Sequence, residues 1–150
     1  MQSQEPMKQE RLSENRRENS MNLNPMDLGV CGVEQVLYAG KVSFDTKDIA
    51  NGVELVELPE NIIITKAVAI VGKAFNAETT NVLTVGTNDT ADDLLGADDV
   101  TEGTAGTYMK SLFEIRKGTP VKVKAKYTST GTAATAGEAD IYLGVVRTPE

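Results

Sequence analysis

The sequence contains no histidine and no tryptophan, and it has one cysteine among its 150 residues. Because histidine is absent, the chain lacks the commonest general base, the commonest metal ligand and every histidine-dependent catalytic triad. The lone thiol, Cys31, cannot close a disulfide within the chain, which excludes a disulfide-stapled secreted scaffold and is compatible with a reducing cytoplasm. We therefore predict that the protein is not an enzyme and uses no cofactor.

Long apolar runs and an excess of positive charge are also missing. No segment approaches the ~20 apolar residues that a membrane-spanning helix needs, and the N-terminus lacks the apolar region of a signal peptide. The formal net charge of −7 argues against a general nucleic-acid binder, because phosphate binding requires clustered lysine and arginine. We expect neither a membrane nor a nucleic acid among its partners.

Short motifs for phosphate, dinucleotide or metal binding are incomplete. The segment Val71-Gly72-Lys73 has neither the preceding glycine nor the following hydroxyl residue of a phosphate loop, and Gly29-Val30-Cys31-Gly32 lacks the dinucleotide fingerprint. An acidic stretch could supply oxygen ligands to Ca²⁺, but its spacing is not that of an EF-hand. A solvated acidic rim is the favoured interpretation, with cation binding left open, for Asp89, Asp92, Asp93, Asp98, Asp99 and Glu102.

What is present favours sheets. Hydrophobic residues make up 40% of the chain and aromatic residues only 5%, so the core consists mostly of valine, isoleucine, leucine and alanine. Such side chains suit pleated sheets packed face to face. At this length the chain can bury one core, and we expect one domain with an appendage.

Alternating apolar and polar residues predict seven or eight strands, with turn signals every 8–15 residues. This pattern is typical of an all-β protein, an antiparallel β-sandwich with either a jelly-roll or an immunoglobulin-like topology. The dipeptide Asn51-Gly52 predicts a turn, and Thr90 to Leu95 a single helical turn. Strands are expected over 33–44, 53–58, 61–75, 81–87, 108–115, 121–127 and 138–145.

Two of these strands carry more detailed predictions about their faces. In the second, Val53, Leu55 and Glu57 are expected to share one face. The segment 62–71 is apolar on both sides, which predicts a central strand covered on both faces.

The last two expected strands have lysines and acids on their outward faces. Lys122, Lys124 and Lys126 alternate with apolar residues, and Glu138 and Asp140 begin the outward face of the strand that follows. If the two strands form a hairpin, the acids face the lysines and fix its register.

The first 24 residues differ from the rest, because glutamine, glutamate, asparagine, serine, arginine and lysine dominate them. This segment cannot pack a core. Its balanced charges at helical spacing allow it to become helical on a partner, and a disordered tail is the alternative. We therefore expect an extended or partly helical N-terminal arm over residues 1–32 and a β-sandwich domain over 33–150.

Several segments resemble a known class of protein. They are an apolar strand ending in Ala74-Phe75-Asn76, then Leu83-Thr84-Val85-Gly86-Thr87 and Ala91-Asp92-Asp93-Leu94-Leu95, and a late turn leading into Gly137-Glu138-Ala139. Over about Val53 to Val146 the chain resembles the small β-sandwich virion proteins of tailed bacteriophages, which include head decoration (capsid cement) proteins and head fibres. The arm is outside this resemblance.

The resemblance implies a non-enzymatic structural protein, a homotrimer made in the host cytoplasm, that decorates and stabilises the capsid exterior of the virion. Its partners would be the major capsid protein and copies of itself. A terminal arm often grips the shell in such proteins, and here the candidate anchoring residues are Arg11, Leu12, Arg16, Arg17 and Leu23.

Two alternatives stay open. Within the same biology, the chain could be a tail or connector component or a head fibre. From a different class, it could be a carbohydrate-binding β-sandwich module, although the shortage of aromatic residues argues against this.

Overall fold

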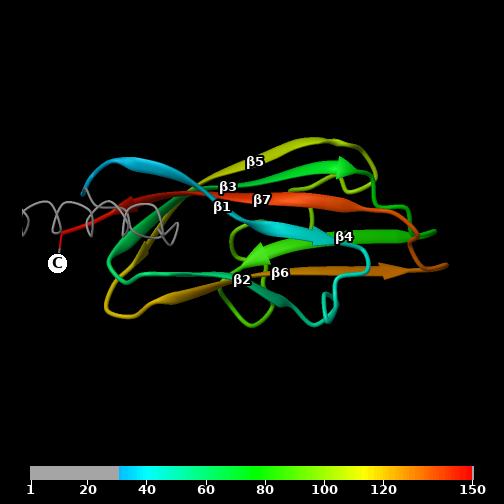
Figure 1. Ribbon diagram of the computed structural model, residues 1–150, viewed down its shortest axis with the longest axis horizontal. Helices are drawn as coiled ribbons and strands as arrows, with labels where there is room; N and C mark the ends of the chain where they lie inside the picture. Colours follow the sequence, from blue (N-terminus) through cyan, green and yellow to red (C-terminus); the bar gives the residue numbers. More distant parts are fainter. Residues whose placement is uncertain (1–30, 150) are drawn as a thin grey trace, which may run out of the picture.

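The computed structural model describes residues 31–149 and contains seven β-strands there (Figure 1). Within this range no helix is long and apolar enough to cross a membrane. In chain order the strands are β1 (Glu34–Ser43), β2 (Val53–Leu58), β3 (Ile62–Lys73), β4 (Thr80–Gly86), β5 (Gly106–Arg116), β6 (Val121–Thr130) and β7 (Glu138–Arg147).

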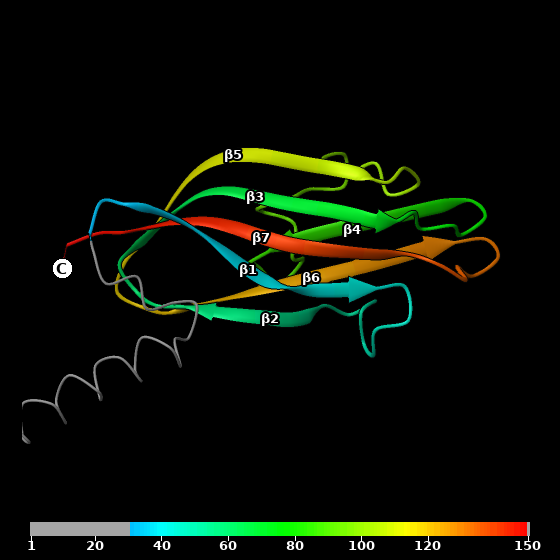
Figure 2. The same ribbon diagram turned by 45° about the horizontal axis from the view of Figure 1, so that its top comes forward.

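The strands form two antiparallel sheets that pack face to face (Figure 2). The larger sheet has the order β1-β7-β3-β5 and the smaller sheet the order β2-β6-β4, so every connection crosses from one sheet to the other. The predicted antiparallel sandwich is confirmed. Its topology is that of a jelly roll, because in an immunoglobulin domain the first two strands share a sheet. Residues 1–30 of the predicted N-terminal arm lie outside the described residues, and its last two residues, Cys31 and Gly32, lie against Arg147 at the end of β7.

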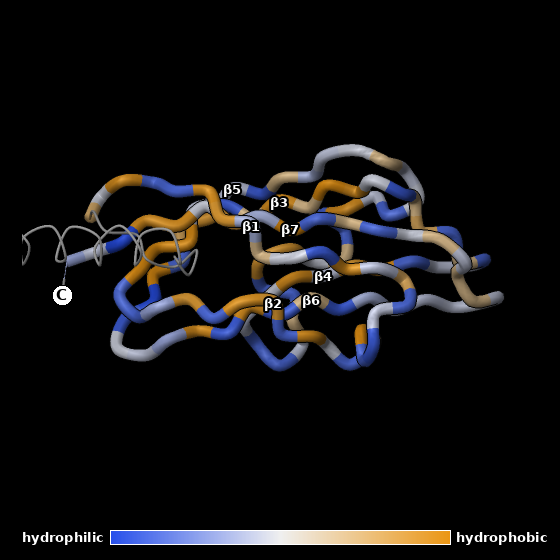
Figure 3. The backbone as a smooth tube through the Cα atoms, viewed as in Figure 1, coloured by the Kyte–Doolittle hydropathy of each residue, from blue (hydrophilic) through white to orange (hydrophobic). Residues whose placement is uncertain are grey.

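The core lies between the two sheets and draws aliphatic side chains from both. Along each strand the inward positions alternate with outward ones, as a period of two residues requires, and Figure 3 shows hydrophobic residues recurring along the strands. Side chains that are completely buried include Leu58, Ile62, Ile64, Leu83, Val85, Val123, Ile141, Leu143 and Val145.

The long strand β3 lies between β7 and β5, which confirms the prediction of a central strand. Its inward side chains, among them Ile64 and Ala67, are fully buried. Within residues 31–149 only the smaller sheet packs against β3. On its other face Ile63 and Ile70 are partly exposed, so the predicted cover of both faces is incomplete in this range, while Val68 between them is only 9% exposed.

A bulge in β2 determines which of its side chains point outward. The register of β2 on β6 shifts between Glu54 and Val56, which leaves Leu55 as the extra residue. The expected face shared by Val53, Leu55 and Glu57 is therefore wrong. Glu57 lies opposite Lys122 and Glu54 opposite Lys124, so both acids share the outward face of the lysines.

The predicted pairing of the last two strands is also wrong. β6 belongs to the smaller sheet and β7 to the larger, so Glu138 and Asp140 do not face the lysines of β6. Between the two strands the chain crosses the sandwich instead of turning tightly. At the end of this crossing Gly137 has φ 144° and lies against the ring of Phe75.

The connection between β4 and β5, residues 87–105, is irregular and lies beside β4 where a further strand would complete the jelly roll. Leu95 makes an isolated bridge to Val85. The predicted helical turn from Thr90 to Leu95 is wrong, because Ala91 has a positive φ of 54°. The amides of Leu94 and Leu95 donate to the carbonyl of Val85 instead of closing a helical turn.

The turn predicted at Asn51-Gly52 is confirmed. Gly52 has φ 99°, a conformation that glycine adopts without strain. The amide of Asn51 donates to the carbonyl of Asp48 at 3.0 Å, and the loop before it returns to the core through Ile49.

Candidate functional site

The outer surface of the larger sheet is apolar over much of its area, and it is the candidate functional site. Antiparallel pairing brings outward side chains of all four of its strands into register. We call this surface the outer apolar face and define it by Val36, Tyr38, Ile63, Val68, Ile70, Met109, Phe113, Ile115, Tyr142 and Val146.

Two rows of side chains run across this face. In the first, Tyr38 lies opposite Tyr142, Tyr142 opposite Val68, and Val68 opposite Met109. The rings of the two tyrosines are 5.1 Å apart, within the range of favourable aromatic contact. The second row joins Val146, Ile63 and Ile115. The face is therefore continuous from one edge strand to the other.

The two edge strands of the larger sheet carry the most exposed members of the face. On β5, Phe113 is 71% and Met109 61% exposed. On β1, Val36 is 57% exposed. Within the described range, all the large hydrophobic residues classed as exposed lie in these two strands, except Val33, which directly precedes β1. Contiguous apolar surfaces are typical of sites that bind another macromolecule, which makes this face the candidate site.

Several of the polar groups on the face are paired within the face itself. Lys66 forms an ion pair with Glu34 at 3.3 Å, and the hydroxyl of Thr65 donates to the same carboxylate. These hydrogen bonds, with that from Thr65 the stronger cause, lower the pKa of Glu34. The hydroxyl of Tyr38 donates to Asp140 at 2.8 Å, and this bond raises the pKa of Tyr38. A partner can therefore cover the face without leaving these charges unpaired.

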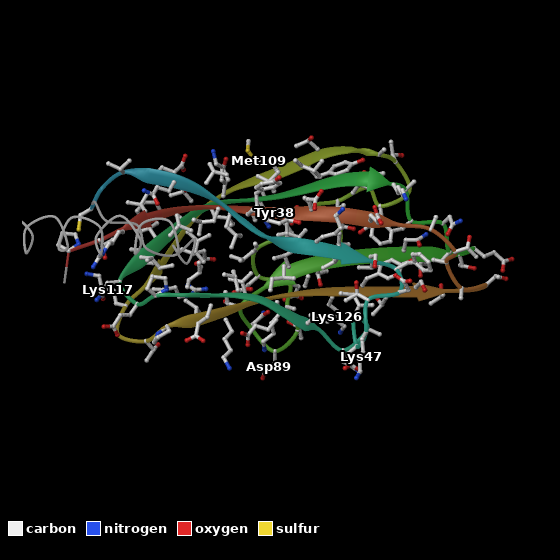
Figure 4. The ribbon with its side chains drawn as sticks, in the orientation of Figure 1. Tyr38, Lys47, Asp89, Met109, Lys117 and Lys126 are labelled. Atoms are coloured by element: carbon white, nitrogen blue, oxygen red, sulfur yellow. The ribbon has the colours of Figure 1, made fainter. Side chains whose placement is uncertain are left out.

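The outer surface of the smaller sheet has the opposite character. The acids of β2 and the lysines of β6 alternate there, and Lys122 lies 3.5 Å from the carboxylate of Glu54. Figure 4 shows Tyr38 and Met109 over the larger sheet and Lys126 on the side of the smaller sheet. The two broad surfaces of the sandwich thus differ, one being apolar and the other charged and hydrated.

The predicted solvated acidic rim is wrong for Glu102, which is buried and accepts from the amide of Leu83 in β4. Asp92, Asp93 and Asp99 accept hydrogen bonds from within their own loop. Asp93 accepts from the amide and hydroxyl of Thr87 and pairs with Arg116 at 3.3 Å. Asp99 accepts from the amide of Gly96, which is the largest cause of its lowered pKa, and pairs with Lys110 at 3.0 Å. In the part of the chain that the structure describes, no cluster of three or more acidic, cysteine or histidine residues could hold a metal ion.

The candidate anchoring residues lie outside the described residues. They are Arg11, Leu12, Arg16, Arg17 and Leu23. The face itself was not predicted from the sequence. Its signal is the alternation in β5, where apolar Met109, Phe113 and Ile115 occupy one side, but alternation alone does not say which side faces the core.

No protein-family model matches the sequence, and a comparison with curated proteins finds no match. Three solved structures share the fold. A chain of the cyanophage Pam1 capsid asymmetric unit is 21% identical, with a TM-score of 0.62 over 85% of this chain and 94% of that chain. A chain of the acidic stable capsid structure of Helicobacter pylori bacteriophage KHP30 is 20% identical, with a TM-score of 0.51 over 80% of this chain and 92% of that chain. A chain of the Ralstonia phage GP4 capsid is 18% identical, with a TM-score of 0.51 over 87% of this chain and 94% of that chain.

Proposed function

We propose that this chain is a non-enzymatic structural protein of a bacteriophage virion, which decorates the exterior of the capsid and stabilises it. The likeness of its fold to chains in three phage capsid structures supports this role. The observation that carries it is the outer apolar face, because a contiguous exposed apolar surface is suited to binding another protein.

The asymmetry of the sandwich supports a different role for each surface. The outer apolar face lies against the shell, where association removes its exposed apolar area from water. The charged surface, with Glu54, Glu57 and the lysines of β6, faces solvent and keeps the particle soluble. The major capsid protein is the partner in this arrangement.

The N-terminal arm, with its candidate residues Arg11, Leu12, Arg16, Arg17 and Leu23, supplies the second contact with the shell. When one contact holds the chain on the lattice, the other becomes effectively intramolecular, so weak contacts add to a high avidity. Assembly as a homotrimer, which the resemblance implies, stays a prediction.

The outer apolar face is tested by a double substitution, Met109→Ser with Phe113→Ser. Both side chains are highly exposed, so the variant is expected to fold with unchanged thermal stability. Its binding to phage particles that lack the protein should fall at least about tenfold, because the apolar area is lost. The matched control, Lys126→Ser on the other surface, should bind normally. Full binding by the double variant would contradict the assignment of this face.

The arm is tested separately by deleting residues 1–24. The truncated protein should remain a folded, β-rich domain, because the described core residues, from Leu37 to Val145, all lie outside the deleted segment. It should no longer saturate the particles in a co-sedimentation assay. Full occupancy by the truncated protein would remove the arm from the proposal and leave the outer apolar face as the binding surface.

Tail, connector and head-fibre roles are distinguished by location and copy number on the particle, which electron microscopy of the intact virion measures.

One observation favours the carbohydrate-binding alternative, namely the pair of tyrosine rings on the outer face, of which Tyr38 is 46% exposed. A glycan-array signal that disappears in Tyr38→Ala would support that alternative over capsid binding.

A further inference from the structure

The loop between β1 and β2, residues 44–52, contains the only asparagine of the sequence that is followed by glycine. In Figure 2 this loop projects from the side of the sandwich on which β1 and β2 lie. Asn51 is exposed, and no atom lies within 4 Å of the Cβ position of Gly52. The side-chain amide of Asn51 is therefore next to a main-chain nitrogen that no side chain shields.

The hydrogen bonds of this loop leave both of these groups weakly held. The amide of Gly52 donates to the carbonyl of Ile49 at 3.4 Å, which is long for such a bond. Among residues 31–149 the side-chain amide of Asn51 has no hydrogen-bond partner. Its carbonyl carbon can therefore rotate toward the nitrogen of Gly52.

The other four asparagines of the described range are protected. Side-chain oxygens that accept hydrogen bonds from main-chain amides belong to Asn76, Asn81 and Asn88. The fourth, Asn61, precedes Ile62, which is completely buried. A residue with a Cβ atom follows each of the four, and its side chain hinders the approach of the main-chain nitrogen to the amide.

We propose that Asn51 is a site of spontaneous deamidation, through which the loop between β1 and β2 changes covalently with time. The nitrogen of Gly52 attacks Cγ of Asn51, and a bond forms between these two atoms while the bond from Cγ to Nδ2 breaks. Ammonia leaves with the proton of the Gly52 amide, and a five-membered imide remains. Water then opens the imide at either carbonyl carbon, which yields aspartate or an isoaspartate whose main chain runs through Cβ and Cγ.

The isoaspartate product loosens the loop, because its main chain is longer by the side-chain methylene. The loop is held on the core by Ile49, which is 5% exposed and whose carbonyl accepts from the amide of Tyr127 in β6 at 3.0 Å. Gly52 donates to the same carbonyl and directly precedes β2. A longer main chain at this point therefore displaces the loop from β6. This proposal does not depend on the virion role.

Incubation of the folded, full-length protein followed by peptide mapping with tandem mass spectrometry tests the site. Asn51 should gain the mass of a carboxyl in place of an amide, about one dalton, at least about tenfold faster than the other four described asparagines. The rate should rise from neutral to mildly alkaline pH, because the nitrogen of Gly52 attacks after losing its proton. An unchanged Asn51, or equal rates at all five positions, overturns the proposal.

Hydroxylamine, which attacks the imide, tests the intermediate. It should cleave the folded wild-type chain between Asn51 and Gly52, and mass measurement identifies the two fragments. Asn51→Gln keeps an amide but cannot close a five-membered ring, so it should neither be cleaved nor gain mass at this position. Asn88→Gln, the matched control, should be cleaved like the wild type. An intact wild-type chain, or equal cleavage of Asn51→Gln, overturns the proposal.

The effect on the loop is tested on the aged products after ion-exchange separation. The isoaspartate form should show faster hydrogen exchange at the amide of Tyr127 than Asn51→Asp, which carries the same charge on a normal main chain. Equal exchange in the two proteins overturns the predicted loosening. None of these results affects the capsid-binding test, because this loop contacts β6 of the smaller sheet and not the outer apolar face.

Discussion

Glu102 is a buried carboxylate in a protein whose other acids lie mostly at the surface. It is 7% exposed, and one of its carboxylate oxygens accepts a hydrogen bond from the amide of Leu83 at 2.7 Å. Burial is the largest influence and raises the pKa of Glu102, which the bond from Leu83 only partly offsets. The group thus binds a proton more strongly in the folded protein than in the unfolded chain.

This difference predicts an effect on stability that depends on pH. The contribution of Glu102 is fully present below its unfolded pKa and is lost as the pH rises through the raised folded pKa. Glu102→Gln keeps the acceptor for Leu83 but cannot ionise. Urea unfolding from pH 4 to pH 8 should show the variant gaining stability over the wild type as the pH increases. A constant difference across this range would contradict the assignment.

Gly137 is required at its position for two reasons. Its φ of 144° is unfavourable for other residues, and a Cβ atom there would lie 2.3 Å from the ring of Phe75, which is itself 2% exposed. We expect Gly137→Ala to lower the free energy of unfolding by about 1–3 kcal/mol. Gly118→Ala is the matched control for backbone strain, since nothing lies within 4 Å of its Cβ position. An equal loss in both variants would rule out the contact with Phe75.

At the scale of elements, the bulge in β2 brings the two acidic residues of this strand to the same, outward face. If the same residues formed a regular strand without the bulge, Glu54 and Glu57 would lie on opposite faces, and one of them would be directed at the core. The bulge therefore allows two acids to pair with the lysines of β6 while Val53 and Val56 stay on the core side.

The resulting charge pairs are exposed, and their contribution is small. Lys122→Glu sets an acid opposite Glu57 and should lower stability by about 0.2–1 kcal/mol at low ionic strength. The loss should shrink in 0.5 M salt, because exposed charges are screened there. A loss that persists in salt would indicate altered packing of β6 instead. Lys122→Gln, which removes the charge without reversing it, is the control.

At the scale of the whole molecule, the two sheets are held together by one shared core. Leu143 from the larger sheet and Leu83 from the smaller sheet are both completely buried in it. Neither sheet can bury its inward face without the other.

The shared core predicts a single unfolding transition. Leu143→Ala should lower stability by about 2–5 kcal/mol, the usual cost of a cavity in a core. Hydrogen exchange should show the amides of β3 and of β6 losing protection together, because both strands depend on the same core. Loss of protection in β3 with β6 unaffected would contradict one cooperative unit.

Local patterns were sufficient to predict the elements. The alternation of apolar and polar residues predicted the strands, and Asn51-Gly52 predicted a turn. The shortage of aromatic residues predicted an aliphatic core between sheets. The helical turn at Thr90 was wrong because bonds to Val85, which belongs to another element, outweighed the local preference.

The sequence by itself determined that this chain folds as an antiparallel sandwich without histidine chemistry. Only the tertiary structure decided which strands are neighbours, that β6 and β7 belong to different sheets, and that Met109 and Phe113 face outward. A strand carries the same two-residue period whichever face is buried, and its partners are remote in sequence. The choice is made by the packing of one sheet on the other, which no single segment contains.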